Sequence, residues 1–176
     1  TDIGFGFNAL QILGFVVIQC GLVKQLLDRL SKLIHQGFRK EHIAIISFQG
    51  FENSAFSNLD RIGTFKLKRF TGDYDHTGRP TTQHGDILFD TIYQYKGQQS
   101  QVVLFVEVDF ERLDEISRNK LYCGMTRATT HLECFFSQSA TDVLNEGYTP
   151  ARCKRDVCFH HETQIISFQN DELSSF

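Results

Sequence analysis

The chain has 176 residues, 41% of them hydrophobic and 22% charged, which is enough apolar sequence for the core of one domain and excludes wholesale disorder. Its formal net charge of −3 excludes the domain-wide basic field of small autonomous DNA-binding modules but leaves room for a local basic groove. The cysteines are odd in number and irregularly spaced, which fits reduced thiols and predicts a cytoplasmic protein.

Neither a metal site nor a membrane span is expected. Cys153 and Cys158 precede His160 and His161, residue types that bind zinc, but the spacing is loose and no second ligand pair follows at zinc-finger distance. No stretch reaches the roughly 18 apolar residues that a bilayer requires, so we expect no membrane partner.

The first half of the chain predicts a helix followed by strands. Apolar residues recur at three- and four-residue steps over residues 21–37, which predicts an amphipathic helix that ends at Gly37. The isoleucine-rich run 43–48 is too short for a helix and predicts a strand buried on both faces. Residues 65–70 alternate apolar with basic side chains, as in a half-exposed strand, and residues 71–86 predict a loop or an exposed hairpin tip.

The second half alternates strands and helices. Strands are predicted at 87–95, 101–110 and 130–136, and helices at 112–128 and 139–147, the last capped by Ser139 or Thr141. This alternation predicts an α/β domain of three layers, RecA-like or doubly wound, with a mainly parallel sheet that binds ligands at the carboxyl ends of its strands. We expect the domain to span residues 1–148 and a loosely structured tail, 149–176, to follow with one strand in "TQIISFQ".

Two stretches carry the functional signal. "TIYQYKGQQS", residues 91–100, resembles motif V of the UvrD/Rep class of superfamily 1 helicases, whose usual form is T-[IV]-H-x-x-K-G-L-E-[FY] before an apolar strand. "KLYCGMTRA", residues 120–128, resembles motif VI, usually L-L-Y-V-A-[LM]-T-R-A. They occur in the family's order with a buried strand between them, and the preceding helix and strand resemble those that carry motif IV.

The resemblance extends over residues 22–138 and implies the second RecA-like domain of an ATP-dependent DNA helicase. The chain contains no G-x-x-x-x-G-K-[ST] phosphate loop, so we expect no ATP hydrolysis from it alone. The resemblance implies ATP and Mg²⁺ as cofactors of the full enzyme, with neither bound to this fragment. The implied partners are single-stranded DNA and an N-terminal RecA-like ATP-binding domain, expected in the same polypeptide.

Arg127 is the expected catalytic residue. Phosphoryl transfer spreads negative charge over the equatorial oxygens, and an arginine placed against them from across an interface stabilises that charge. The resemblance to motif VI makes Arg127 this arginine finger, and the alternative is a structural ion pair with Asp109 or Glu107. The residues expected at the nucleotide are Lys96, Gly97, Gln99 and Arg127.

Thr91 and Tyr93 are expected to face the DNA. Tyr93 stands where motif V usually has His, and Gln99 stands where Glu usually receives the ribose hydroxyl. Tyrosine still stacks on bases, and an amide still bonds a hydroxyl. The alternative role for Tyr93 and Tyr95 is packing on a strand face.

One basic cluster adds candidate DNA contacts. Lys66, Lys68 and Arg69, with Arg79 beyond them, would bind strand phosphates, or would form a solvated strand edge that blocks aggregation. The arginine usual after the motif IV strand is missing from "SFQGFEN". This loss leaves a second function open, a degenerate, non-catalytic module that binds nucleic acid or protein without turnover.

Overall fold

The computed structural model describes residues 9–78, 80–147, 158–160 and 163–169. Three α-helices and ten strands are present in these ranges, with two short 3-10 helices, η1 and η2. In chain order they are α1 (Ala9–His35), η1 (Lys40–His42), β1 (Ile43–Ser47), η2 (Phe51–Asn53), β2 (Arg61–Ile62), β3 (Phe65–Lys68), β4 (Phe70–Tyr74), β5 (Pro80–Thr82), β6 (Ile87–Thr91), β7 (Ser100–Val108), α2 (Glu115–Met125), β8 (Ala128–Ser137), α3 (Gln138–Gly147), β9 (Cys158–His160) and β10 (Thr163–Gln169).

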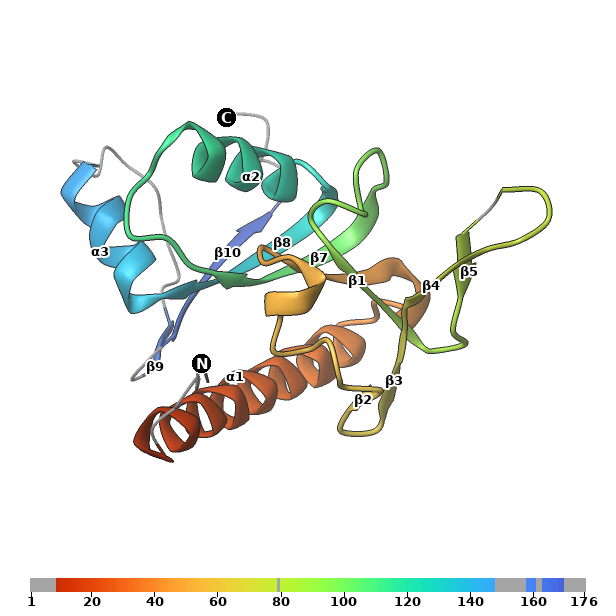
Figure 1. Cartoon of the computed structure of the whole chain (residues 1–176), viewed down its shortest axis with the longest axis horizontal. Helices are drawn as coiled ribbons and strands as arrows, with labels where there is room; N and C mark the ends of the chain where they lie inside the picture. Colours follow the sequence, from red (N-terminus) through yellow and green to blue (C-terminus); the bar gives the residue numbers. More distant parts are fainter. Residues whose placement is uncertain (1–8, 79, 148–157, 161–162, 170–176) are drawn as a thin grey trace, which may run out of the picture.

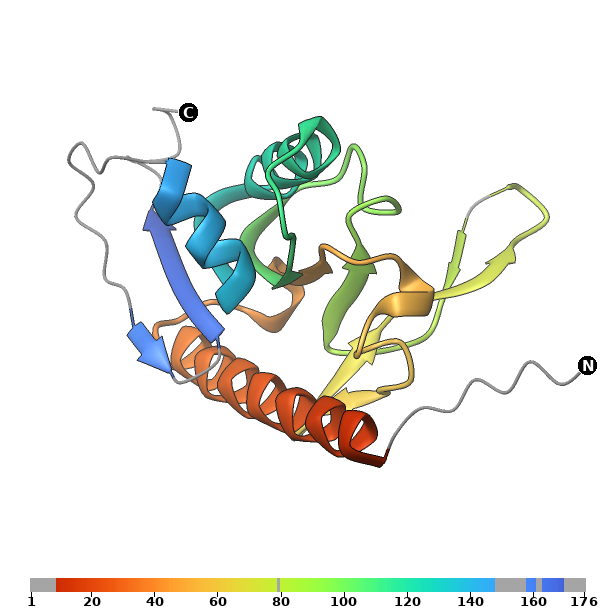
Figure 2. The same ribbon diagram turned by 60° about the vertical axis from the view of Figure 1, so that its left-hand side comes forward.

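Eight of the described strands form one sheet in the order β2-β3-β6-β1-β7-β8-β10-β9 (Figure 1). The five strands in the middle, from β3 to β8, run parallel to one another, and the strands at both edges are antiparallel. Strands β4 and β5 pair only with each other and form a ribbon that projects from the body (Figure 2). The predicted α/β fold with a mainly parallel sheet is therefore confirmed.

The helices cover both faces of the sheet, which gives the three predicted layers. Helix α1 lies on one face, and α2 and α3 lie on the other (Figures 1 and 2). Because successive side chains of a strand point to opposite faces, Ile43 and Ile45 of β1 pack with α1, while Ala44 and Ile46 pack on the side of α2. All five residues of β1 are buried, so the prediction of a strand covered on both faces is confirmed.

Several boundaries differ from the predictions. Helix α1 begins at Ala9, earlier than expected, and Gly37 (φ 98°) ends it with the N–H of Phe38 on the carbonyl oxygen of Leu33 (3.2 Å). The strand predicted at 65–70 is divided between β3 in the sheet and β4 in the ribbon. The predicted caps of the last helix are wrong. Strand β8 continues directly into α3, so Ser137 accepts the N–H of Ala140 (3.1 Å).

The predicted strand "TQIISFQ" is confirmed as β10. It pairs antiparallel with β8, and Ile166 of β10 lies opposite Cys134 of β8. Strand β9 continues the sheet beyond it, so part of the segment expected as a loose tail belongs to the sheet. The domain boundary at residue 148 stays a prediction. Arg79, Cys153 and His161 lie outside the described residues.

Glu107 organises the carboxyl ends of the central strands. Its backbone is left-handed (φ 58°), a conformation that L residues rarely adopt. Its carboxylate accepts the hydroxyl of Ser47 (2.5 Å), the hydroxyl of Ser54 (2.7 Å) and the N–H of Ala55 (2.6 Å). These bonds hold the segment that follows β1 over the end of β7. The carboxylate of Glu107 therefore has a structural role.

Gly124 of α2 lies against Phe105 of β7, and this contact seats the helix on the sheet. A Cβ at position 124 would lie 2.3 Å from the ring of Phe105, which is completely buried. We expect Gly124→Ala to lower the free energy of unfolding by about 1–3 kcal/mol, because overpacking outweighs the better helix propensity of alanine. Urea denaturation measures this change.

Gly21 of α1 supplies the matched control, because a Cβ there meets nothing within 4 Å. We expect Gly21→Ala to be neutral or to stabilise by up to about 1 kcal/mol. Equal stabilities of the two variants would show that the ring of Phe105 moves aside.

Within the described part of the chain, no helix is both long enough and apolar enough to cross a membrane. The same residues contain no group of three or more His, Cys, Asp or Glu side chains arranged to hold a metal ion.

Candidate functional site

The turn after β6 is held by hydrogen bonds to Thr91. The carbonyl oxygen of Thr91 accepts the N–H groups of Tyr95 (2.9 Å) and Gln94 (3.1 Å), and its hydroxyl accepts the N–H of Gln94 at 3.4 Å. Gly97 has φ 83°, the left-handed region that favours glycine, so it completes the turn. The Thr91 side chain is only 2% exposed and stabilises the turn, whereas Tyr93 on the turn is 59% exposed.

Tyr95 on this turn and Asp90 at the end of β6 are both buried. The hydroxyls of Tyr95 and Ser100 are hydrogen-bonded at 2.6 Å, and burial raises the pKa of Tyr95 although the Ser100 bond partly opposes it. Burial raises the pKa of Asp90 to about 6, and the bond from the N–H of Thr91 partly opposes that increase. Tyr95 therefore packs in the core, as its alternative role had it, but from the turn and not from a strand face, and its phenol stays uncharged at neutral pH.

Arg127 lies between the end of α2 and the start of β8. Its Nε donates to the carbonyl oxygen of Cys123 (2.9 Å), and one terminal nitrogen lies 3.5 Å from the carbonyl oxygen of Gln98. Among the described residues, no carboxylate oxygen lies within 4.0 Å of this guanidinium. The two carboxylates considered as ion-pair partners bind elsewhere, Glu107 to Ser47 and Ser54, and Asp109 to Ser137 (2.6 Å).

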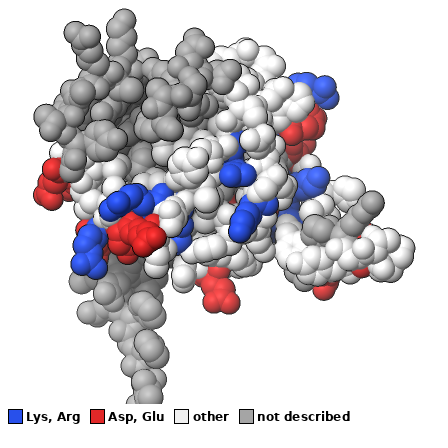
Figure 3. All heavy atoms as spheres, turned by 90° about the horizontal axis from the view of Figure 1, so that it is seen from above, with Lys and Arg blue, Asp and Glu red and all other residues white. Residues whose placement is uncertain are grey.

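A groove of about 330 Å³ separates the turn after β6 from helix α2. Apolar side chains, among them Ile92 and Ile116, line much of it, and its charged side chains are Lys96, Lys120 and Arg127. None of the acidic side chains that the structure describes lines it. Figure 3 looks onto this side of the molecule and shows basic side chains near its middle with uncharged surface around them. The groove is therefore suited to a ligand that carries negative charge.

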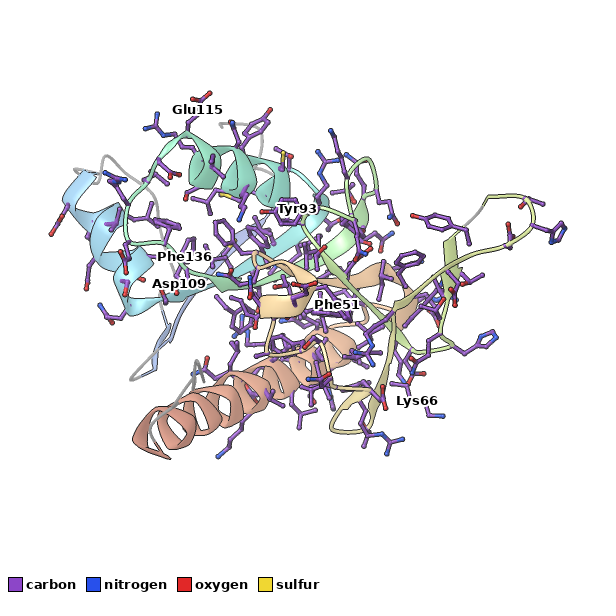
Figure 4. The ribbon with its side chains drawn as sticks, in the orientation of Figure 1. Phe51, Lys66, Tyr93, Asp109, Glu115 and Phe136 are labelled. Carbon is purple, nitrogen blue, oxygen red and sulfur yellow. The ribbon has the colours of Figure 1, made fainter. Side chains whose placement is uncertain are left out.

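Lys120 lines the groove and contacts aromatic rings from two other segments. Its Nζ lies 4.9 Å from the centre of the Phe48 ring, just after β1, and 5.1 Å from the centre of the Tyr93 ring, on the turn. Such cation–π contacts contribute about 0.5–2 kcal/mol each. Lys120 itself belongs to α2, and Figure 4 shows Tyr93 next to that helix.

The predicted site residues gather only in part. Lys96 and Arg127 share the groove, and Gly97 and Gln99 lie on the exposed part of the loop beside it. Tyr93 also lines the groove, while Thr91 is buried below it.

The basic cluster lies apart from the groove. Lys66 and Lys68 are exposed on β3, and Figure 4 shows Lys66 well away from Tyr93. The Arg69 side chain is 11% exposed, and its guanidinium binds the carboxylate of Asp60 and the carbonyl oxygen of Ser57. Arg69 therefore fixes the segment before β2, whereas Lys66 and Lys68 present their charges to solvent.

The motif resemblance assigns no role to Lys120 or Asp90. Lys120 stands in motif VI where leucine is usual, which was a visible signal of a local difference. Nothing in the sequence indicates that Asp90 is buried, because its environment is made by strands that lie far apart along the chain.

Part of the chain matches the model of a known protein family. Residues 86–132 match the UvrD-like helicase C-terminal domain, a range that includes both motif-like stretches but less than half of the chain. No curated protein matches the chain.

Two crystal structures share its general outline at low identity, both of magnesium protoporphyrin IX methyltransferase from Synechocystis PCC 6803. The form with bound SAM has a TM-score of 0.45 and 14% identity over 93% of this chain and 85% of that chain. The form with bound SAH has a TM-score of 0.47 and 13% identity over 93% of this chain and 89% of that chain. Likeness at this level says nothing about the activity of this chain.

Proposed function

We propose that the chain is the second RecA-like domain of an ATP-dependent superfamily 1 DNA helicase of the UvrD type. The match over residues 86–132 and the α/β fold with a mainly parallel sheet both support this function. In the complete enzyme, an ATP-binding domain would face the groove, and this chain would close the nucleotide site from the opposite side.

The observation that carries the proposal is the environment of Arg127. Its guanidinium is anchored by backbone carbonyl oxygens of Cys123 and Gln98, at the edge of a groove that no acidic residue of the described ranges lines. An arginine held in this way keeps its charge available for an anion, whereas a structural arginine is normally neutralised by a carboxylate.

The side chains of the groove are suited to bind the phosphates of a nucleotide rather than the Mg²⁺ ion that accompanies it. Lys96 and Arg127 would bind phosphate oxygens, and Gln99, on the exposed loop, would bond a ribose hydroxyl. Bound ATP would supply the free energy that drives closure of the two domains. Among the described residues the groove offers no carboxylate for Mg²⁺, so the facing domain would hold that ion.

Tyr93 would carry the DNA half of the function. Its exposed ring is held by Lys120 beside the groove and offers a face on which a base stacks. We expect the 176-residue chain to bind a 16-nucleotide oligo(dT) more tightly than a duplex of the same length, with affinity that falls as salt rises.

The test is fluorescence anisotropy with Tyr93→Ala and, as the control, Tyr122→Ala. Tyr122 is equally exposed, lies on α2 and does not line the groove. Loss of one stacking ring is expected to weaken binding roughly five- to a hundred-fold, and the control is expected to match the wild type. Equal effects of the two variants, or no preference for single strands over the duplex, would refute the DNA-binding part of the proposal.

A non-catalytic interaction module is the second candidate. The burial of Thr91 favours it, because a buried side chain does not reach a DNA strand, and Gln99 lacks the charge of the glutamate that is usual at its position. The two functions differ in whether the full-length polypeptide hydrolyses ATP.

A further inference from the structure

Lys120 is held more firmly than an ordinary surface lysine. Its ammonium lies between the rings of Phe48 and Tyr93, at 4.9 and 5.1 Å from their centres, and its side chain is half-buried. A lysine normally loses rotamer freedom when it binds a ligand, and the two rings restrict that freedom in advance. The ammonium is thus pre-oriented at the groove.

The groove concentrates positive charge without neutralising it. Lys96, Lys120 and Arg127 line one hollow, and no carboxylate oxygen of the described residues lies within 4.0 Å of any of them. The electrostatic interaction of Lys120 with Asp114, the N-cap of α2, is weak. The pKa of Asp114 is lowered mainly by its hydrogen bonds with Ser117. Three cations in one hollow create a local positive potential that favours a polyanion.

We propose that Lys120 is a third phosphate-binding residue of the groove, held in place by Phe48 and Tyr93, and that it binds the phosphate chain of a nucleoside triphosphate. This inference rests on the proposed function and extends it to a residue that the motif resemblance does not assign. The volume of about 330 Å³ suits one small ligand rather than a length of nucleic-acid strand. The neighbour of Phe48 is the neutral Gln49, so the end of β1 offers no cation of its own.

The test is isothermal titration of the 176-residue chain with inorganic tripolyphosphate, without divalent cations. A charged hydrogen bond contributes about 1.5–3 kcal/mol, so Lys120→Met is expected to weaken binding roughly ten- to a hundred-fold. Lys120→Arg keeps the charge and should restore most of the affinity.

Lys24→Met is the matched control, because Lys24 is exposed on α1, on the opposite face of the sheet. It removes the same charge from the chain and should leave the affinity unchanged. Thermal unfolding of each variant verifies the fold, and Lys120→Gln replaces Lys120→Met if the latter fails to fold.

The outcomes separate this inference from the function on which it rests. If Arg127→Ala weakens tripolyphosphate binding and Lys120→Met does not, the inference is wrong and the proposed function stands. If Lys120→Met weakens only oligo(dT) binding, the phosphate belongs to the strand and the assignment to a nucleoside triphosphate is wrong. A wild-type chain that binds neither probe would overturn both.

Discussion

Replacement of Arg127 by alanine in the full-length polypeptide is expected to lower the kcat of DNA-stimulated ATP hydrolysis about a thousand-fold or more. The guanidinium would stabilise charge that develops on the transferring phosphoryl group, and such arginine fingers contribute about three to five powers of ten to kcat. KM for ATP should change much less than kcat, because the interaction is strongest in the transition state. Steady-state ATPase assays with saturating single-stranded DNA measure both constants.

Arg118→Ala is the control for this substitution. Arg118 also lies on α2, but it is exposed, donates to the carbonyl oxygen of Leu113 (3.2 Å) and does not line the groove. Its loss should leave kcat unchanged. Arg127→Lys should remain strongly impaired, because one ammonium does not reproduce the planar fork of a guanidinium. A kcat within about threefold of the wild type for Arg127→Ala would refute the arginine finger.

The second large effect is expected in stability, at the ion pair between α1 and β8. Arg29 binds Glu133 through two hydrogen bonds of 2.8 and 2.7 Å, and the Glu133 side chain is 2% exposed. Arg29→Met leaves this buried carboxylate with His131 (2.9 Å) as its one remaining side-chain partner among the described residues, so we expect a loss of about 3–5 kcal/mol at pH 7. Chemical denaturation measures the loss.

The effect should depend on pH in a defined direction. Burial alone would raise the pKa of Glu133, but the hydrogen bonds from His131 and Arg29 outweigh it and lower the pKa below its ordinary value of 4.5. The pair therefore stabilises the wild type above pH 4.5, and this contribution is lost as the pH falls through the lowered pKa. The gap between Arg29→Met and the wild type should narrow in acid, where the carboxylate is protonated.

Two variants isolate the buried charge as the cause. The double variant Arg29→Met/Glu133→Leu removes both charges and should recover much of the stability. Lys32→Met breaks the exposed pair of Lys32 with Asp28 on the same helix and should cost less than about 1 kcal/mol. A loss of under about 1 kcal/mol for Arg29→Met at pH 7 would contradict this account of the pair.

The fold was predictable wherever a local pattern decides the structure. The periodicity of Leu22, Leu26, Leu30 and Leu33 indicates a helix because all four side chains enter one core, and the apolar run of β1 indicates a strand covered on both sides. Helix ends were predicted less well. The cap at Ser137 depends on a direct passage from strand to helix, which no local composition signals.

The candidate site was predictable only where a motif resemblance assigned it. That resemblance led to Arg127 and Lys96, which share the groove. It did not lead to Lys120, because its contacts join three segments that come together only in the folded sheet. For Thr91 the motif suggests a ligand contact, but the structure shows hydrogen bonds from Thr91 that stabilise the turn.

The central claim is that this chain completes an ATP site that belongs to a second domain. Its most direct test is the rate of ATP hydrolysis by the full-length polypeptide, with and without oligo(dT), beside the 176-residue chain under the same conditions. We expect hydrolysis that single-stranded DNA accelerates in the full-length polypeptide, and none above background for the chain alone. A full-length polypeptide that hydrolyses no ATP, or hydrolyses it at the same rate with and without DNA, would contradict the claim.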